Sequence, residues 1–127
     1  MTKERLETWM AALGHAWEAG DAAAATRLFR EDISCQEDPF AAPLQGREAV
    51  REYWADVPRT QKEIRFGFET LAVTADGGIF HWWASFTRIP SGAAVRLDGA
   101  QIVKLDDNNL CYSLREWWMR EEAGSEE

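Results

Sequence analysis

Cysteine, histidine and long apolar runs are scarce in this sequence, and each scarcity excludes a class of protein. Cys35 and Cys111 are the two cysteines, and they have neither zinc-ligand spacing nor a histidine cluster beside them. We therefore expect two buried free thiols in a reducing compartment, and no metal or other cofactor. No apolar run approaches the roughly 20 residues that span a bilayer. Residues 1–13 carry charges where a signal peptide would be apolar, so the expected location is the cytoplasm, away from membranes.

Basic residues are also in the minority. The chain has 14 lysines and arginines against 22 aspartates and glutamates, a net charge of −8. An acidic surface repels phosphate backbones, so nucleic acid is not an expected partner. The sequence is instead rich in hydrophobic residues (46%), among them seven tryptophans in 127 residues. That composition predicts one globular domain over residues 1–120, followed by an acidic flexible tail at 121–127.

The first half of the chain predicts three helices. In the first, which ends at Gly20, apolar residues recur at three- and four-residue spacing. These residues are Leu6, Trp9, Met10, Leu13 and Trp17. Asp21 can cap a second, short helix over 22–29, and a third helix follows Gly46 and is stopped by Pro58. Between the second and third helices, residues 33–38 predict a strand and residues 39–43 a loop.

The second half predicts strands. Turn signals at 76–78, 91–92 and 106–109 divide residues 62–119 into four segments rich in β-branched and aromatic residues. Consecutive strands joined by tight turns form an antiparallel meander. Helices followed by a sheet predict an α+β fold with the helices on one face of the sheet.

Two adjacent tryptophan pairs, Trp82-Trp83 and Trp117-Trp118, lie in predicted strands. Neighbouring strand residues point to opposite faces, so both faces of the sheet carry tryptophan. The helices cover only one face, and an exposed aromatic patch on the other usually marks an interface. We expect a homodimer through this outer face, with His81, Trp83 and Trp117 as candidate contacts. The alternative is a C-terminal segment that folds back over them.

Cross-strand pairing can be derived if the turns centre on residues 91–92 and 107–108. The resulting rows on one face are Trp82–Gln101–Leu114, Ala84–Gly99–Glu116 and Phe86–Leu97–Trp118. The small residues Ala84 and Gly99 predict a hollow beside Glu116, between rows of large side chains. An aromatic hollow with a few polar groups is typical of a site for a small hydrophobic molecule.

Two carboxylates are candidate catalytic groups. Glu116 lies on the inner, apolar face, where burial raises a carboxyl pKa toward the range useful for acid–base chemistry; the alternative is a structural ion pair or a position near the solvent-facing rim. Asp38 ends the predicted strand directly before Pro39. The alternative for Asp38 is ordinary turn chemistry.

The order and spacing of several short motifs resemble the nuclear transport factor 2-like superfamily, in its SnoaL-like and steroid delta-isomerase branch. The motifs are Trp17-Glu18-Ala19-Gly20-Asp21, Leu28-Phe29, Asp32, Glu37-Asp38-Pro39, Gly46 and Ala49-Val50-Arg51-Glu52-Tyr53-Trp54. The resemblance covers nearly the whole chain. It implies a cone in which a strongly curved, mostly antiparallel sheet wraps around a long helix, with a pocket at the open end. It also implies dimers through the outer sheet face.

The same resemblance implies roles for particular residues. Asp38 falls where the isomerases have a catalytic base, and Leu13 and Gln101 fall where they have oxyanion donors. A leucine cannot donate a hydrogen bond, whereas the Gln101 amide can. Tyr53 and Trp54 fall where the family has pocket aromatics.

Three hypotheses remain open at this stage. The first is cofactor-free acid–base catalysis on a small hydrophobic molecule, with Asp38 as base, Glu116 as second acid and Gln101 or Tyr53 as oxyanion donor. The second is a non-catalytic binding module, and the third a dimeric interaction module. The expected pocket residues are Leu13, Trp17, Tyr53, Trp54, Trp82, Ala84, Phe86, Gly99, Gln101 and Trp118.

Overall fold

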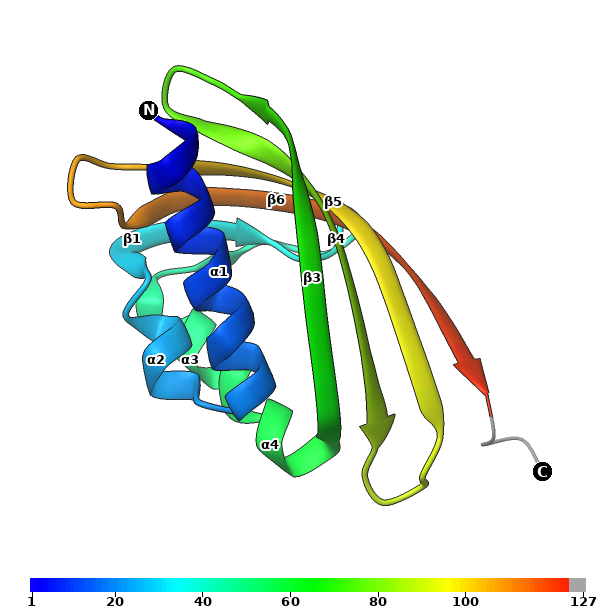
Figure 1. Cartoon of the computed structure of the whole chain (residues 1–127). Helices are drawn as coiled ribbons and strands as arrows, with labels where there is room; N and C mark the ends of the chain where they lie inside the picture. Colours follow the sequence, from blue (N-terminus) through cyan, green and yellow to red (C-terminus); the bar gives the residue numbers. More distant parts are fainter. Residues whose placement is uncertain (124–127) are drawn as a thin grey trace.

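In the computed structural model, which describes residues 1–123, helices pack against one face of a six-stranded curved sheet (Figure 1). The predicted α+β class is confirmed. The helices are α1 (Lys3–Ala19), α2 (Ala22–Thr26), α3 (Arg47–Ala55) and α4 (Val57–Thr60). The strands are β1 (Phe29–Gln36), β2 (Leu44–Gln45), β3 (Gln61–Val73), β4 (Gly77–Arg88), β5 (Ala94–Leu105) and β6 (Cys111–Ala123).

The strand order in the sheet is β2-β1-β6-β5-β4-β3. The four long strands β3 to β6 form the predicted antiparallel meander. Strand β1 lies parallel to β6, with Cys35 beside Leu114, so the first strand of the chain neighbours the last. Short β2 pairs antiparallel with β1. The sheet is therefore mixed, and its one parallel pairing among the described residues joins the two ends of the fold.

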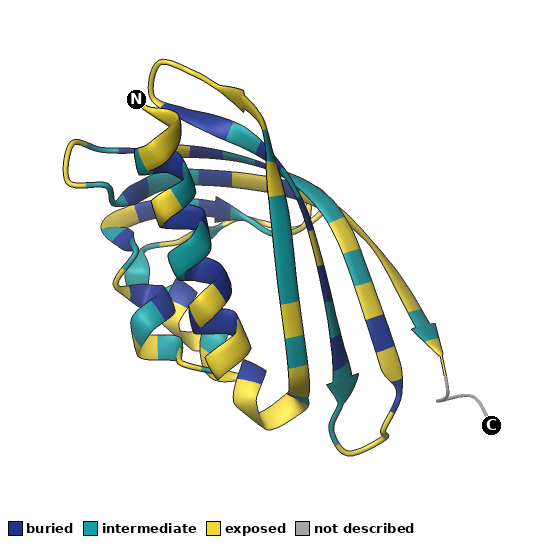
Figure 2. Cartoon of the chain, in the orientation of Figure 1, coloured by how far each residue is buried: buried dark blue, intermediate teal, exposed yellow. Residues whose placement is uncertain are grey.

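Helix α1 has clear signals at both ends. The Thr2 side chain accepts a hydrogen bond from the Arg5 backbone N–H (3.1 Å), and Gly20 ends the helix in a left-handed conformation (φ 64°). One side of α1 is buried against the sheet (Figure 2). The buried residues are Leu6, Trp9, Met10, Leu13, Gly14, Ala16 and Trp17, which include the whole apolar stripe predicted from the sequence.

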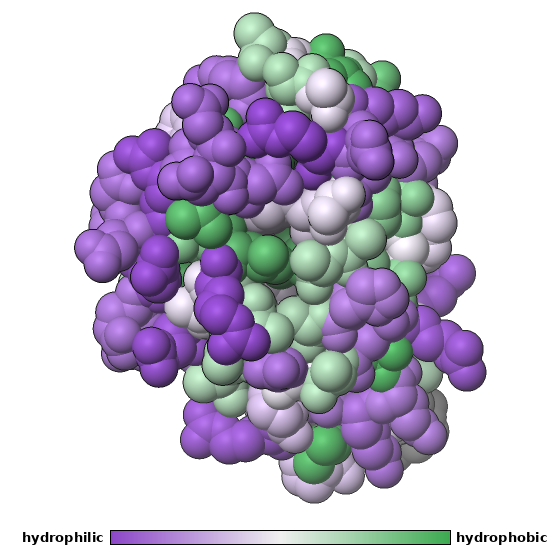
Figure 3. All heavy atoms as spheres, turned by 60° about the vertical axis from the view of Figure 1, so that its left-hand side comes forward, coloured by the Kyte–Doolittle hydropathy of each residue, from purple (hydrophilic) through white to green (hydrophobic). Residues whose placement is uncertain are grey.

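Hydrophilic residues cover most of the face shown in Figure 3 and surround a smaller central apolar area. This distribution agrees with the large share of charged residues in the sequence, 28%. Across residues 1–123, no helix is long and apolar enough to cross a membrane.

The predicted strand register is wrong by two residues in both hairpins. Gly99 pairs with Trp82 and Trp118, rather than with Ala84 and Glu116. The turn after β4 is centred one residue earlier than predicted, because the Arg88 N–H bonds the Ala93 carbonyl (2.8 Å). The turn after β5 is displaced in the opposite direction by an irregularity at the end of β5. Because a shift of two preserves the alternation of side chains, every residue stays on its predicted face.

Several element boundaries also differ from the predictions. Helix α2 ends at Thr26, and β1 occupies Phe29–Gln36, earlier than the predicted 33–38. Pro58 does not stop the third helix: α3 ends at Ala55, and Pro58 lies in the first turn of α4, where proline is well tolerated. At the other end, residues 121–123 continue β6, and the rest of the predicted tail lies outside the described residues.

Gly99 is required for the close approach of β5 to its neighbours. A Cβ atom there would lie 2.6 Å from the Trp117 carbonyl oxygen and 2.9 Å from the Trp118 Cβ. We expect Gly99→Ala to lower the free energy of unfolding by about 1–3 kcal/mol, because strand backbone must move. Urea denaturation would measure this. Ala94→Ser, which adds one heavy atom at an exposed position of β5, is the control and should change stability by less than about 0.5 kcal/mol. Equal stability of Gly99→Ala and the parent chain would contradict the packing argument.

Candidate functional site

A cavity of about 280 Å³ lies between the helices and the inner face of the sheet. Its walls are mostly aromatic: the Trp17 ring lies 5.7 Å from Trp54, 5.7 Å from Phe66 and 5.8 Å from Trp82, measured between ring centroids. The Trp17 indole N–H donates to the Gln61 side-chain oxygen (2.8 Å), which fixes this central ring. Residues that also line the cavity include Leu13, Tyr53, Phe86, Leu97, Gln101, Leu114, Glu116 and Trp118.

Glu116 is the buried acid of this cavity. It is 7% exposed, and its Oε1 accepts a hydrogen bond from the Gln101 side-chain amide (3.0 Å). Burial raises the pKa of Glu116 well above its usual range, and the charge and hydrogen bonding of the neighbouring Glu37 raise it further. The Gln101 hydrogen bond acts in the opposite direction but is the smallest of these effects. The buried site therefore favours the protonated form of Glu116.

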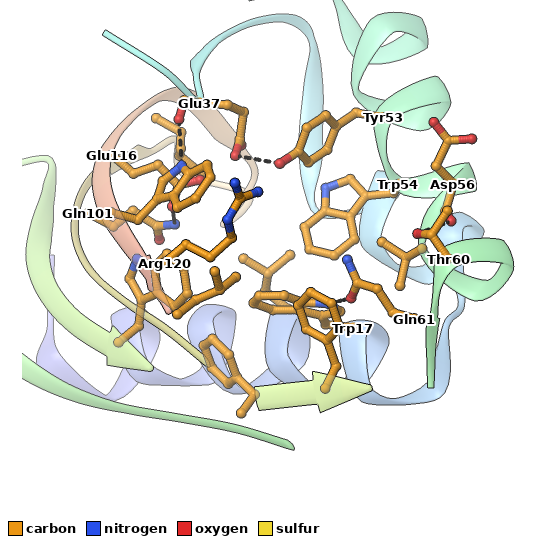
Figure 4. Close-up of a pocket in the computed structure, with 18 of the residues that line it drawn as sticks. Trp17, Glu37, Tyr53, Trp54, Asp56, Thr60, Gln61, Gln101, Glu116 and Arg120 are labelled. Atoms are coloured by element: carbon orange, nitrogen blue, oxygen red, sulfur yellow. Dashed lines mark hydrogen bonds between the residues drawn. The ribbon is translucent and has the colours of Figure 1, made fainter. Parts of the chain in front are cut away.

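Glu37 lines the cavity beside Glu116, directly after β1. Each of its carboxylate oxygens accepts one hydrogen bond: Oε1 from the Tyr53 hydroxyl (3.0 Å) and Oε2 from the Cys35 thiol (3.1 Å). Its backbone carbonyl accepts a third, from the Trp118 indole N–H (2.8 Å). Figure 4 shows the Glu37 carboxylate pointing toward Tyr53 across the cavity. Donors from α3 and β1 thus hold this carboxylate in position, and a donor from β6 holds the backbone of Glu37.

The Cys35 thiol acts here as a hydrogen-bond donor rather than as a nucleophile. It is 2% exposed, and burial, followed by the nearby charge of Glu37, strongly raises its pKa. A buried thiol that keeps its proton is unreactive. Cys35 and Cys111 are both free and buried. Within residues 1–123, no three histidine, cysteine or acidic residues are grouped so that they could hold a metal.

Charged residues also line the cavity on its more exposed side. Arg88 makes two hydrogen bonds to Glu122, each 3.0 Å long, and they lower the pKa of the Glu122 carboxyl. Asp56, the residue before α4, forms an ion pair with Arg59 of α4, three residues later. Arg120 lines the cavity from β6.

Most of the pocket residues expected from the sequence line this cavity. They are Leu13, Trp17, Tyr53, Trp54, Trp82, Phe86, Gln101 and Trp118, together with the acid Glu116. The cavity does not lie over Ala84 and Gly99, where the hollow was predicted. Trp82 and Trp118 occupy the space beside Gly99, and Ala84 is buried in the core opposite Leu97.

Asp38 lies outside the cavity, contrary to expectation. It is exposed, and its Oδ1 accepts a hydrogen bond from the Phe40 backbone N–H (2.9 Å). This is the turn chemistry that was the alternative for Asp38. Alternation along β1 explains the difference, because Ile33 and Cys35 are buried and Glu37 follows in the same phase. The alternation of apolar residues along β1 could have predicted that Glu37 faces the core. No feature of the sequence indicated that Arg120 would line the cavity.

Comparison with known proteins identifies the family and the fold. The sequence model described as "SnoaL-like domain" matches residues 8–112. No curated protein sequence matches the chain. Among solved structures, the epoxide hydrolase/cyclase-like enzyme SalBIII, studied for pyran ring formation in the polyether salinomycin, is 21% identical, with a TM-score of 0.79 and 92% of each chain covered.

Two further structures share the fold. Delta 5-3-ketosteroid isomerase from Mycobacterium sp. is 15% identical, with a TM-score of 0.78, and the match covers 94% of this chain and 98% of the isomerase. A computationally designed 17-OHP binder is 16% identical, with a TM-score of 0.73, 92% of this chain and 97% of the binder being covered. At these identities the likeness is one of fold, and one of the three proteins is a binder rather than an enzyme.

The buried proton on Glu116 makes stability depend on pH. Because the folded-state pKa is raised, the native chain holds a proton that the unfolded chain loses above the ordinary glutamate pKa of 4.5. Stability should therefore fall as pH rises above that value, by up to about 1.4 kcal/mol per pH unit, until the raised pKa is reached. In Glu116→Gln, which keeps the oxygen that accepts from Gln101, this dependence should disappear. Urea denaturation of both proteins from acid to alkaline pH would measure it, and identical pH slopes would refute the buried proton.

Proposed function

The chain belongs to the family of SnoaL-like domains, and from the geometry of its cavity we propose that it binds a small hydrophobic molecule and catalyses proton transfer on it without a cofactor. One observation carries this proposal: a carboxyl pair, Glu37 and Glu116, lies in a cavity that is lined mostly by aromatic and aliphatic side chains, with several charged and polar groups among them. Two neighbouring carboxyl groups, one of which is fully buried, can supply both a proton acceptor and a proton donor, which acid–base catalysis needs. An isomerase and a cyclase-like enzyme share the fold, which agrees with such chemistry.

In this proposal Glu37, rather than Asp38, is the base. The Glu37 carboxylate removes a proton from a carbon next to a carbonyl group of the ligand. The protonated Glu116 donates its proton to the carbonyl oxygen, so an enol forms and no charge is left on the ligand. When the ligand has a carbon–carbon double bond next to that carbon, the enol is a dienol. Return of the proton from Glu37 to the far end of the dienol, with Glu116 recovering its own proton from the oxygen, moves the double bond and completes an isomerisation. Tyr53 and Cys35 keep the Glu37 carboxylate in position before and after the transfer.

The second candidate is a module that binds the same kind of molecule without changing it. Both oxygens of Glu37 already accept hydrogen bonds, from Tyr53 and Cys35, which leaves less of the carboxylate free to contact a ligand. Leu13 lines the cavity but offers no donor to a developing oxyanion. These two observations favour binding, so the experiment must separate binding from turnover.

A suitable probe is 5-nitrobenzisoxazole, an apolar molecule that opens to a coloured phenolate when a base removes its ring proton. We expect the parent protein to accelerate this reaction, and Glu37→Gln to lower kcat/KM by about 100-fold or more, the usual contribution of a general base. Absorbance would follow turnover, and calorimetry would follow binding of the probe. Asp38→Asn is the matched control, because Asp38 is the adjacent carboxylate but lies outside the cavity.

Three results would overturn the catalytic proposal. Loss of activity in Asp38→Asn, with normal activity in Glu37→Gln, would show that Asp38 is the base and that the assignment to Glu37 is wrong. Equal activity in all three proteins would place the reaction outside the cavity. Saturable binding of the probe with no turnover by the parent protein would establish the binding module instead.

We further propose that two copies of the chain associate through the outer face of the sheet. Trp83 and Trp117 are 41% and 38% exposed there, and Met119 on the same strand is 79% exposed. His81 lies between Trp83, 5.0 Å from its ring, and the carboxylates of Glu69 and Asp98. Apolar side chains ringed by charged ones are typical of an interface.

We expect Trp117→Lys to shift the chain from dimer to monomer, because a desolvated lysine opposes association. Sedimentation equilibrium over a range of concentrations would measure the change. Ala55→Lys, which adds the same charge at an exposed position of α3, should leave the dimer intact. A monomeric parent protein, or equal dimerisation of the parent and Trp117→Lys, would refute the proposed interface.

A further inference from the structure

Most charged groups around the cavity are paired with an oppositely charged neighbour. On the sheet side, Arg88 is neutralised by Glu122, which accepts from it at both oxygens (3.0 Å each). On the helix side, Asp56 is neutralised by its ion pair with Arg59. Glu116 is held neutral by burial beside Glu37. Among charged groups that line the cavity in residues 1–123, Glu37 and Arg120 remain without an oppositely charged hydrogen-bond partner.

Arg120 is a cation placed toward the cavity and available to a ligand. It lies on β6 four positions beyond Glu116, in the same phase of the strand, so its side chain leaves the sheet on the inner face. Its Cα partner on β5 is Leu97, another cavity residue. Arg120 forms a long ion pair with Glu122: its Nε lies 3.9 Å from Oε1, too far for a hydrogen bond, and Arg88 already occupies both oxygens of Glu122.

The side chain of Arg120 is also 53% exposed, so its guanidinium is partly hydrated when no ligand is bound. Figure 4 shows Arg120 on the same side of the cavity as Glu116 and Gln101, opposite Trp54 and Thr60. An anionic group on a molecule that fills the aromatic cavity would therefore meet a guanidinium at one edge. The planar fork of a guanidinium matches a carboxylate in geometry and charge.

Building on the proposed function, we propose that the ligand of this cavity is a hydrophobic carboxylic acid, bound as its carboxylate by Arg120. The apolar body lies among Trp17, Trp54 and Trp82, and the carboxylate lies at the Arg120 edge. A monoanion fits better than a phosphate ester, because the same cavity holds the Glu37 carboxylate and the chain as a whole carries a net charge of −8, so a second negative charge on the ligand would be repelled. The position of the carboxylate at Arg120 then determines which part of the ligand faces Glu37 and Glu116.

Two naphthalene compounds of nearly equal size test this assignment: naphthalene-2-carboxylate and the neutral 2-acetylnaphthalene. Calorimetry at neutral pH would give the dissociation constant of each for the parent protein and for Arg120→Gln. We expect the parent protein to bind the carboxylate at least tenfold more tightly than the ketone. In Arg120→Gln this preference should be lost, with affinity for the ketone changed by less than twofold.

Two further variants isolate the role of the guanidinium. Arg96→Gln removes an exposed arginine that pairs with Glu121, and it should keep the full preference for the carboxylate. Arg120→Lys keeps the charge but loses the fork, and it should keep only part of the preference. Circular dichroism of each variant would establish that it is folded, as the exposure of Arg120 leads us to expect.

The outcomes separate this inference from the proposed function. Ketone binding with no preference for the carboxylate, or a preference that survives in Arg120→Gln, would refute the role of Arg120 and leave the cavity as a hydrophobic binding site. Binding of neither compound would refute the cavity as a site for small hydrophobic molecules, and this inference with it.

Discussion

Glu116 loses its water when the chain folds, and the loss of hydration is tolerated only because the carboxyl group keeps a proton and finds polar partners. Those partners come from separate parts of the chain: Gln101 from β5, and Glu37 from the segment after β1. Glu37 is in turn held by Tyr53 of α3 and Cys35 of β1. Hydrogen bonds join Gln101 to Glu116, and Tyr53 and Cys35 to Glu37, so four parts of the chain must come together to build the inner end of the cavity. The surrounding tryptophans and phenylalanines exclude water from it and strengthen every electrostatic interaction within it.

The sequence was sufficient to predict the elements that repeat with a regular period. The apolar stripe of α1 and the alternation of β3 to β6 are local patterns, and both appear in the structure. The face on which each strand residue lies was also predictable, because the register error was an even number of residues. The same resemblance that suggested the SnoaL-like family from short motifs was confirmed by the match over residues 8–112.

Features that depend on an exact register or on the end of a strand were not predictable. Which of the two adjacent carboxylates, Glu37 or Asp38, lines the cavity depends on a shift of one residue at the end of β1, and the proline after Asp38 gives no information about that shift. The cavity is not beside Gly99, because the Trp82 ring, the Trp118 Cβ and the Trp117 carbonyl group fill the space that a missing side chain leaves. Arg120 lacks a hydrogen-bonded carboxylate because Arg88 occupies both oxygens of Glu122. That pairing joins residues 34 positions apart in the sequence, so local sequence patterns do not predict it.

The parallel pairing of β1 with β6 has a consequence for how the domain is made. The carboxyl pair joins a residue that follows the first strand to a residue on the last, so neither half of the chain contains the site. During synthesis, the edge of β1 that pairs with β6 has no partner strand until residues 111–123 have left the ribosome. Contacts of such long sequence separation form late and slow the folding of a domain. A ribosome that stops before β6 therefore releases helices and a meander of three strands in which Glu37 has no second acid beside it.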